Sequence, residues 1–215
     1  MGLWESQILP RVTEAALSNA PVRELRTSAL RHATGRVLEL GFGSGTNLPH
    51  YPASVTRVDA VEPSETAWRM SRPRRRAAAL PVDRVGVDGA AIGAETATYD
   101  TVVVTFALCT IPDVRAALRE AARVLVPGGR LCALEHGLSP DPDVARRQHR
   151  LDPWERRLAG GCHLTRDPVA LVSEAGLDVG RVEQDYLPGG LRVMRPWTHL
   201  TVLEAVRPSG AATQG

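Results

Sequence analysis

The sequence predicts an α/β protein built on a mostly parallel, doubly wound sheet with helices on both faces. Short apolar, β-branched runs alternate with helical segments over residues 36–135, which is typical of strand–helix–strand units with parallel strands. The run Tyr99–Phe106 has the continuous apolar centre of a strand that is buried on both faces. The first run ends in a glycine-rich turn, and sheets of this class bind ligands at the carboxyl ends of their strands.

Each expected element follows from a local pattern. Strands are predicted at residues 36–40, 55–61, 82–87, 99–106, 130–135, 179–186 and 199–206. Helices are predicted at residues 6–20, 22–33, 64–79, 113–125, 141–159 and 168–175. Pro73 should break or kink the third helix. Asp167 is a good N-cap for the last one, with Pro168 at its first position and Gly176 as its stop.

The chain is expected to form one domain over residues 1–207. Residues 1–34 should form a helical cap, and residues 137–166 an insertion beside the edge of the sheet that binds ligands. The small, polar residues 208–215 predict a flexible tail.

Composition excludes several functions. All 26 basic residues are arginine, so lysine Schiff-base chemistry, a phosphate-loop lysine and a tyrosine–lysine dehydrogenase pair are ruled out. The net charge of +2, with four Trp, three Tyr and two Phe, argues against a nucleic-acid partner. No apolar run reaches the roughly 18–20 residues of a membrane span. We expect no signal peptide, reduced cysteines and a cytoplasmic protein.

The most informative segment is the turn after the first strand, which reads E-x-G-x-G-x-G. Its members are Glu39, Gly41, Gly43 and Gly45, and Thr46 stands where a dinucleotide fingerprint has its third glycine. Glycines allow close approach of the backbone to a ligand. Glu39 would repel a phosphate, so the turn favours a cationic ligand over a pyrophosphate.

Two more acids follow the next two strands. Glu62 is placed to accept hydrogen bonds from two ribose hydroxyls, and Asp88 from an exocyclic amine such as that of adenine. Each alone is equally typical of a solvated turn. As a series behind a glycine turn, they predict a site for an adenosine that carries positive charge.

These motifs carry a family resemblance. The segments ELGFGSGTN, VEPS, VDG and LVPGGRLCALEH resemble the successive motifs of class I S-adenosylmethionine-dependent methyltransferases, over roughly residues 35–207. The resemblance implies a seven-stranded, Rossmann-like sheet with an antiparallel last strand, and S-adenosylmethionine as methyl donor. The implied donor-binding residues are Glu39, Gly41, Gly43, Gly45, Asn47, Glu62, Pro63, Asp88, Gly89, Thr105, Phe106 and Ala107.

The downstream half resembles a narrower group. The segments ALCTIPD, LEHG, LDPWERRLAGGCHLTRD and VMRP are similar to the methyltransferase-like family that includes alkyl thiol S-methyltransferases. This similarity implies a small-molecule acceptor, with a thiol sulfur preferred. Related proteins resemble quinone and phospholipid methyltransferases, so methylation of carbon or oxygen on a quinone-like or polyketide ring is the alternative.

Candidate bases are His136, just past the fifth strand, and His163 in the GCHLTRD segment. No paired-acid or metal-ligand pattern is visible, so a metal-independent enzyme is expected. A thiol is partly ionised at neutral pH and needs little help from a base. Cys109 and Cys162 are expected to line the pocket or the core. A nicotinamide-dependent oxidoreductase and a non-catalytic adenosylmethionine-binding module are the rival functions.

Overall fold

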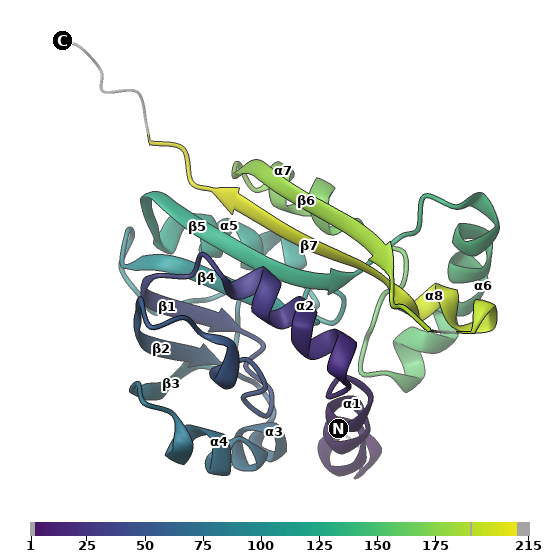
Figure 1. Cartoon of the computed structure of the whole chain (residues 1–215), viewed down its shortest axis with the longest axis horizontal. Coiled ribbons are helices and arrows are strands. Elements are labelled where there is room, and N and C mark those ends of the chain that lie inside the picture. Colours follow the sequence, from purple (N-terminus) through teal and green to yellow (C-terminus); the bar gives the residue numbers. More distant parts are fainter. Residues whose placement is uncertain (1–2, 190, 210–215) are drawn as a thin grey trace.

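The computed structural model describes residues 3–189 and 191–209. They form one seven-stranded sheet of order β3-β2-β1-β4-β5-β7-β6 (Figure 1). Only β7 runs antiparallel to its neighbours, and the other pairs are parallel. The predicted fold class and the antiparallel last strand are therefore confirmed. The strands are β1 (Gly35–Leu40), β2 (Val55–Val61), β3 (Val82–Gly86), β4 (Tyr99–Thr105), β5 (Leu125–His136), β6 (Asp178–Tyr186) and β7 (His199–Val206).

Helices cover both faces of this sheet. The helices are α1 (Leu9–Ala16), α2 (Ala20–Leu30), α3 (Glu65–Met70), α4 (Arg72–Ala77), α5 (Val114–Val124), α6 (Pro142–Leu158), α7 (Pro168–Glu174) and α8 (Arg195–Thr198). A π-helical turn (Trp4–Ile8) precedes α1, and 3₁₀ turns lie at Leu48–His50 and Arg192–Met194. Helix α2 packs on β5 and β7, whereas α5 and α7 lie on the opposite face (Figure 1).

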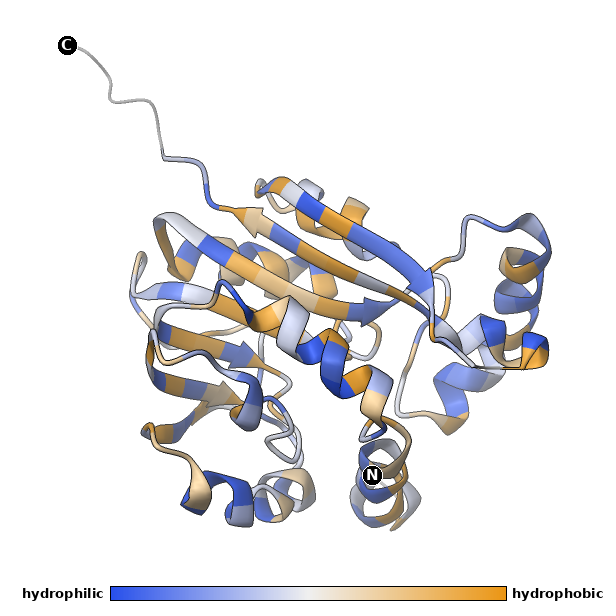
Figure 2. Ribbon diagram, viewed as in Figure 1, coloured by the Kyte–Doolittle hydropathy of each residue, from blue (hydrophilic) through white to orange (hydrophobic). Residues whose placement is uncertain are grey.

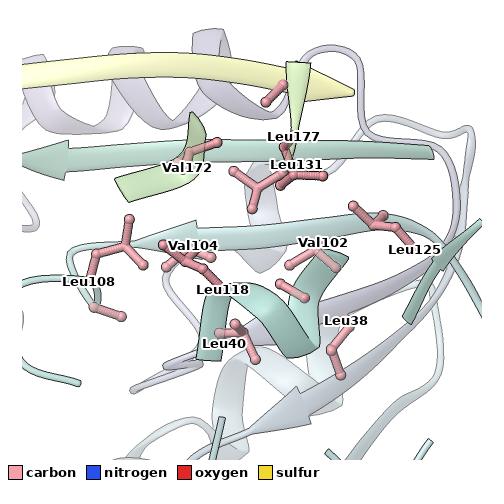
Figure 3. Close-up of a cluster of buried hydrophobic side chains, with 14 of the residues drawn as sticks. Leu38, Leu40, Val102, Val104, Leu108, Leu118, Leu125, Leu131, Val172 and Leu177 are labelled. Atoms are coloured by element: carbon pink, nitrogen blue, oxygen red, sulfur yellow. The ribbon is translucent and has the colours of Figure 1, made fainter. Parts of the chain in front are cut away.

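Alternating strand residues feed the two cores. Leu38 and Val102 point into the larger one together with Leu118 of α5 and Val172 of α7 (Figure 3). Val37, the residue before Leu38, packs on the other face of the sheet. This alternation is the period of two expected of strands. Strands β1 and β4 pair side by side at the point where the strand order reverses.

Three predicted elements differ in detail. The segment 64–79 is two helices, because Pro73 sits at the start of α4 and cannot continue α3. The N-terminal helix 6–20 is divided between the π-helical turn and α1. Strand β5 begins at Leu125 rather than Arg130, with a break in pairing around the Pro127–Gly129 segment.

Helix α6 lies beside the end of the sheet with α8 rather than on a face of it (Figure 1). Its buried residues are Val144, Gln148 and Asp152. The sequence spaces Trp154 and Leu158 along the same side of this helix as Val144, but both are exposed. Hydrophobic residues concentrate along the central strands, whereas α6 mixes both kinds (Figure 2). Within the described ranges, no helix has both the length and the apolar character to cross a bilayer.

The flexible tail predicted for residues 208–215 falls mostly on residues 210–215, which lie outside the described residues. The division of the chain into one domain with a cap and an insertion stays a prediction.

Candidate active site

The turn after β1 requires its glycines. Gly41, Gly43 and Gly45 have φ values of +72°, +59° and +76°, a region that L side chains rarely adopt. A Cβ on Gly41 would lie 2.5 Å from the Cβ of Ala107, and one on Gly45 would lie 3.2 Å from the ring of Phe42. The turn therefore brings bare backbone against the end of β4.

Glu62 ties this turn to the end of β2. Its carboxylate accepts the N–H of Gly43 at 2.6 Å and the N–H of Ser64 at 2.7 Å. The side chain is buried, and burial raises the pKa of Glu62 despite both bonds. Pro63 is exposed beside it. A carboxylate offers about four acceptor positions, so Glu62 keeps capacity for ribose hydroxyls.

Asp88 follows β3 in an exposed turn, where its carboxylate accepts the N–H of Ala90 at 2.9 Å. Gly89 lies against α5, and a Cβ there would be in ordinary contact at 3.5 Å from the Cβ of Ala117. The cavity of about 320 Å³ that Asp88 helps to line extends along the strands to Arg36. The structure thus leaves Asp88 accessible at the same edge as Glu62.

A buried polar cluster lies behind the turn. Asn47 donates to Glu39 at 2.8 Å and to Thr105 at 2.9 Å, and the hydroxyl of Tyr51 donates to Glu39 at 2.7 Å. Arg26, reaching in from α2, donates to Asn47 at 2.7 Å and to Thr105 at 2.9 Å. Helix α2 therefore supplies a cation to the end of β1, which carries Glu39.

Burial governs the ionisation of this cluster. It raises the pKa of Glu39 to about 7, although hydrogen bonds from Tyr51 and Asn47 oppose the shift. Burial also lowers the pKa of Arg26 to about 10. Because an added positive charge nearby favours the ionised carboxylate, the cluster is suited to a cationic ligand.

The end of β4 is held by a second buried acid. Glu135 accepts the N–H groups of Ala107 and Leu108 at 2.8 and 3.0 Å. Burial raises the pKa of Glu135 to about 7. Phe106 has a positive φ of 53°, and its ring lies 5.2 Å from the guanidinium carbon of Arg26. Thr105 thus contacts the cluster that holds Glu39, and the backbone of Ala107 contacts Glu135.

Of the two candidate bases, only His136 meets other reactive side chains. Its Nε2 lies 3.1 Å from the Sγ of Cys162, and Cys109 joins this pair. Hydrogen bonding from Cys109, and then from His136, lowers the pKa of Cys162. Burial lowers the pKa of His136, but contact with Cys162 outweighs it and raises the pKa overall. His163 lines a surface cavity instead, with its Nδ1 3.9 Å from Asp152.

Three buried side-chain atoms of the described residues have no hydrogen-bond partner. They are Arg26 Nε, Glu135 Oε2 and His136 Nδ1, and all three belong to the edge formed by the ends of β1, β4 and β5. Buried polar atoms are nearly always paired in native proteins. The unpaired atoms and the bare glycine turn together fit a polar ligand that occupies this edge.

Sequence reasoning missed Arg26, Tyr51 and Glu135. Arg26 lies on the same face of α2 as Val22 and Leu30, which are buried. That spacing was the available signal, since an arginine on a covered helix face needs a polar partner. No comparable signal pointed to Tyr51. Glu135 ends an uninterrupted run of buried residues in β5 that begins at Leu131, and an acid in a buried strand is itself unusual.

The comparisons with known proteins agree with this geometry. A family described as a methyltransferase domain matches residues 38–133. The human thiol S-methyltransferase TMT1B is 30% identical over 185 residues, which are 80% of this chain and 75% of that protein. The demethylmenaquinone methyltransferase of Clavibacter sepedonicus is 34% identical over 125 residues, covering 58% of this chain and 51% of that protein. A solved S-adenosylmethionine-dependent methyltransferase of Mesorhizobium loti has a TM-score of 0.63 at 18% identity, covering 89% and 100% of the two chains.

A doubly wound sheet with a glycine turn and acids at successive strand ends defines a class of nucleoside-binding enzymes. This chain belongs to the class I S-adenosylmethionine-dependent methyltransferases and is related within them to the thiol S-methyltransferases. It is an enzyme whose methyl donor is S-adenosylmethionine, and it acts on a small-molecule acceptor.

Proposed function

We propose that this methyltransferase transfers a methyl group to a thiol sulfur of a small, fairly hydrophobic molecule. The observation that carries the proposal is the 30% identity to a thiol S-methyltransferase across 80% of the chain. It is supported by the strand end that carries His136, which lies close to Cys162; among the residues that the structure describes, we find no carboxylate pair beside it for general-base work on an alcohol. We call this end of β5, with the loops around it, the acceptor edge.

The donor is proposed to lie across the glycine turn. Glu62 would accept the ribose hydroxyls, and Asp88 with Gly89 would contact the adenine. Gly41, Gly43 and Gly45 would border the methionine part, whose ammonium suits Glu39. Pro63 and Asn47 complete this side, with Thr105, Phe106 and Ala107 near the sulfonium. Arg26 adds a cation whose free Nε would meet the donor carboxylate.

When bound, the donor supplies an already activated methyl group, so the chain's part is mainly alignment. Holding two reactants in line is worth effective molarities of about 10⁵ M or more. The turn and Glu62 fix one partner, and Glu135 fixes the backbone of Ala107 and Leu108. His136 is the group best placed to take the acceptor's proton, with His163 as the second candidate.

The cap and the insertion give the acceptor its surroundings in this proposal. The cap reaches the donor site through Arg26 of α2. Gln148 of the insertion donates to the carbonyl of Gly137, which directly follows β5, at 3.0 Å and to that of Pro196 in α8 at 2.9 Å. Tyr186, Leu187 and Trp197, all half-buried, are the candidate apolar wall. We further propose a cytoplasmic enzyme, in keeping with its three free cysteines, that acts without nucleic acid, in keeping with its net charge of only +2.

Methylation of a quinone-like or polyketide ring is the second candidate, favoured by the identity to a demethylmenaquinone methyltransferase. The purified chain, methyl-labelled donor and a panel of alkyl thiols, phenols, quinols and amines separate the two. We expect label in thioether products. Label only in ring products would reject the sulfur assignment, and donor binding without turnover on any acceptor would indicate a non-catalytic binding module.

A further inference from the structure

Two cysteines and a histidine that the sequence separates widely meet at the acceptor edge. The Sγ atoms of Cys109 and Cys162 and a ring nitrogen of His136 all lie within 4.8 Å of one another. We propose that these three side chains bind one zinc ion. The sequence predicts no metal, because the three residues form no CxxC-type spacing and come together only through the fold.

The ligand set is one that zinc prefers. Thiolate sulfur and imidazole nitrogen bind zinc at about 2.3 and 2.0–2.1 Å. A tetrahedral ion with these bonds separates two sulfurs by roughly 3.8 Å and a sulfur from a nitrogen by roughly 3.6 Å. The cluster already lies within 4.8 Å, and His136 Nε2 must move only about half an ångström from Cys162 Sγ.

The three ligands sit on segments that are fastened to one another. The carbonyl of Cys109 accepts the N–H of His163 at 2.9 Å. The guanidinium of Arg166 donates to the carbonyl oxygens of Leu108 and Ile111. These bonds join the loop after β4 to the loop after α6. The site is therefore largely formed before any ion binds, which lowers the cost of ordering the ligands.

The cluster offers three protein ligands and no more. No fourth His, Cys, Asp or Glu joins it within residues 3–189 and 191–209. Three protein ligands with an open position are the arrangement of catalytic zinc sites, whereas structural sites are closed by four. Cys109 and Cys162 are 4% and 7% exposed, so the cluster is nearly dry but not sealed.

The open position extends the proposed function, and this step rests on it. A thiol acceptor that binds there would lose its proton to solvent, since a coordinated thiol is deprotonated. His136 would then hold the ion through Nε2 instead of taking this proton. The thiolate sulfur would then form a bond to the methyl carbon while the carbon–sulfur bond of the donor breaks. The electron pair of that bond stays on the donor sulfur, which becomes a neutral thioether.

The test measures metal binding apart from activity. The full chain is reduced, stripped with chelator, loaded with Zn²⁺ and desalted, and the metal is counted by mass spectrometry. Co²⁺ loading reports the ligands through its thiolate charge-transfer and tetrahedral ligand-field bands. We expect about one ion per chain, and a loss of affinity of about 100-fold or more in Cys162→Ser, Cys109→Ser and His136→Asn, since even outer partners of a metal are worth 10–100-fold.

Cys132→Ala is the matched control, because Cys132 is also buried but lies on β5 away from the cluster. It should keep the metal. Binding of S-adenosylhomocysteine shows that each variant is folded, and the cobalt spectrum of the wild type needs no variant. Wild-type chain without metal, a spectrum without thiolate bands, or a Cys109–Cys162 disulfide formed in place of the metal site would overturn the proposal.

Activity assays then separate the two proposals. Zinc binding with methylation of ring acceptors only would reject the thiol function and leave the metal site standing. Thiol methylation by a chain that binds no zinc would reject the site and leave the function standing. Both hold if the loaded chain methylates thiols and the stripped chain loses at least tenfold in rate.

Discussion

The donor edge and the acceptor edge of this molecule are built in different ways. At the proposed donor edge, the acids and glycines lie within a few residues of a strand end, and backbone N–H groups of two strand-end turns, those of Gly43 and Ser64, donate to Glu62. At the acceptor edge, contacts join distant segments. His136 meets Cys162, and the hydroxyls of Ser139 and Tyr186 lie 2.6 Å apart. Local chemistry therefore defines the donor, and tertiary packing defines the acceptor.

The two buried acids show the same contrast. Glu39 is paired with the side chains of Asn47 and Tyr51, whereas Glu135 is paired with the backbone of the loop after β4. Burial raises the pKa of each to about 7. Glu39 can therefore respond to a ligand's charge, while Glu135 mainly sets the shape of the loop.

The largest effect is expected from Glu62→Ala. It removes the carboxylate that would accept hydrogen bonds from the ribose of the methyl donor, and it leaves the N–H groups of Gly43 and Ser64 without this partner. Two hydrogen bonds to a charged group are worth about 1.5–3 kcal/mol each, so affinity for S-adenosylhomocysteine should fall about 100-fold or more by calorimetry. Glu65→Ala is the control, because Glu65 is exposed in its ion pair with Arg84. Equal affinity in the two variants would show that Glu62 does not hold the donor.

The next effect compares two glycines of one turn. Gly41 and Gly43 both have positive φ, so alanine costs each about 1–2 kcal/mol in backbone strain. Only Gly41→Ala adds a clash, with Ala107 at 2.5 Å. We expect Gly41→Ala to lose about 2 kcal/mol more free energy of unfolding than Gly43→Ala, measured by denaturant titration. Equal losses would mean that Ala107, at the end of β4, moves to make room for the added methyl group.

Substitutions of the two candidate bases, His136 and His163, test the proposed acceptor edge. His136→Asn should lower kcat/KM for a thiol about 30-fold at neutral pH, less than a typical general-base effect, because a thiol needs little help from a base. His163→Asn should change it less than about threefold, since its ring is away from the cluster and faces Asp152. Donor affinity should stay the same in both. A larger loss at His163 would move the acceptor to the cavity that His163 lines.

The sequence predicts the features set by local signals better than those set by tertiary packing. Six of the seven strands could be predicted to within one residue at each end, because β-branched runs and turn residues are local signals; β5 begins five residues before the expected Arg130. The helix cap at Asp167 forms as expected. The places of Glu39, Glu62 and Asp88 at strand ends could be predicted because they follow from chain order alone.

The rest depends on contacts that no local pattern specifies. Arg26 enters the donor site only because α2 packs across β5 and β7. Cys109, His136 and Cys162 meet through two loops and a strand end. In α6, the residues spaced along one side are buried at Val144 and Gln148 but exposed at Leu158, because the helix lies beside the sheet. Periodicity shows that a face exists, not what covers it.

The smallest effect is a pH dependence that belongs to the donor edge alone. With a pKa of about 7, Glu39 is mostly protonated at pH 6 and ionised at pH 8, and the donor's ammonium favours the ionised form. Affinity for S-adenosylhomocysteine should therefore rise with pH, by roughly five- to tenfold between pH 6 and 8. Glu39→Gln should bind more weakly and without this slope, whereas Glu135→Gln should retain it, because Glu135 is paired with the loop after β4. If the slope vanished in Glu135→Gln instead, the charge that the donor meets would lie at the end of β5, and the assignment of the two edges would have to be reversed.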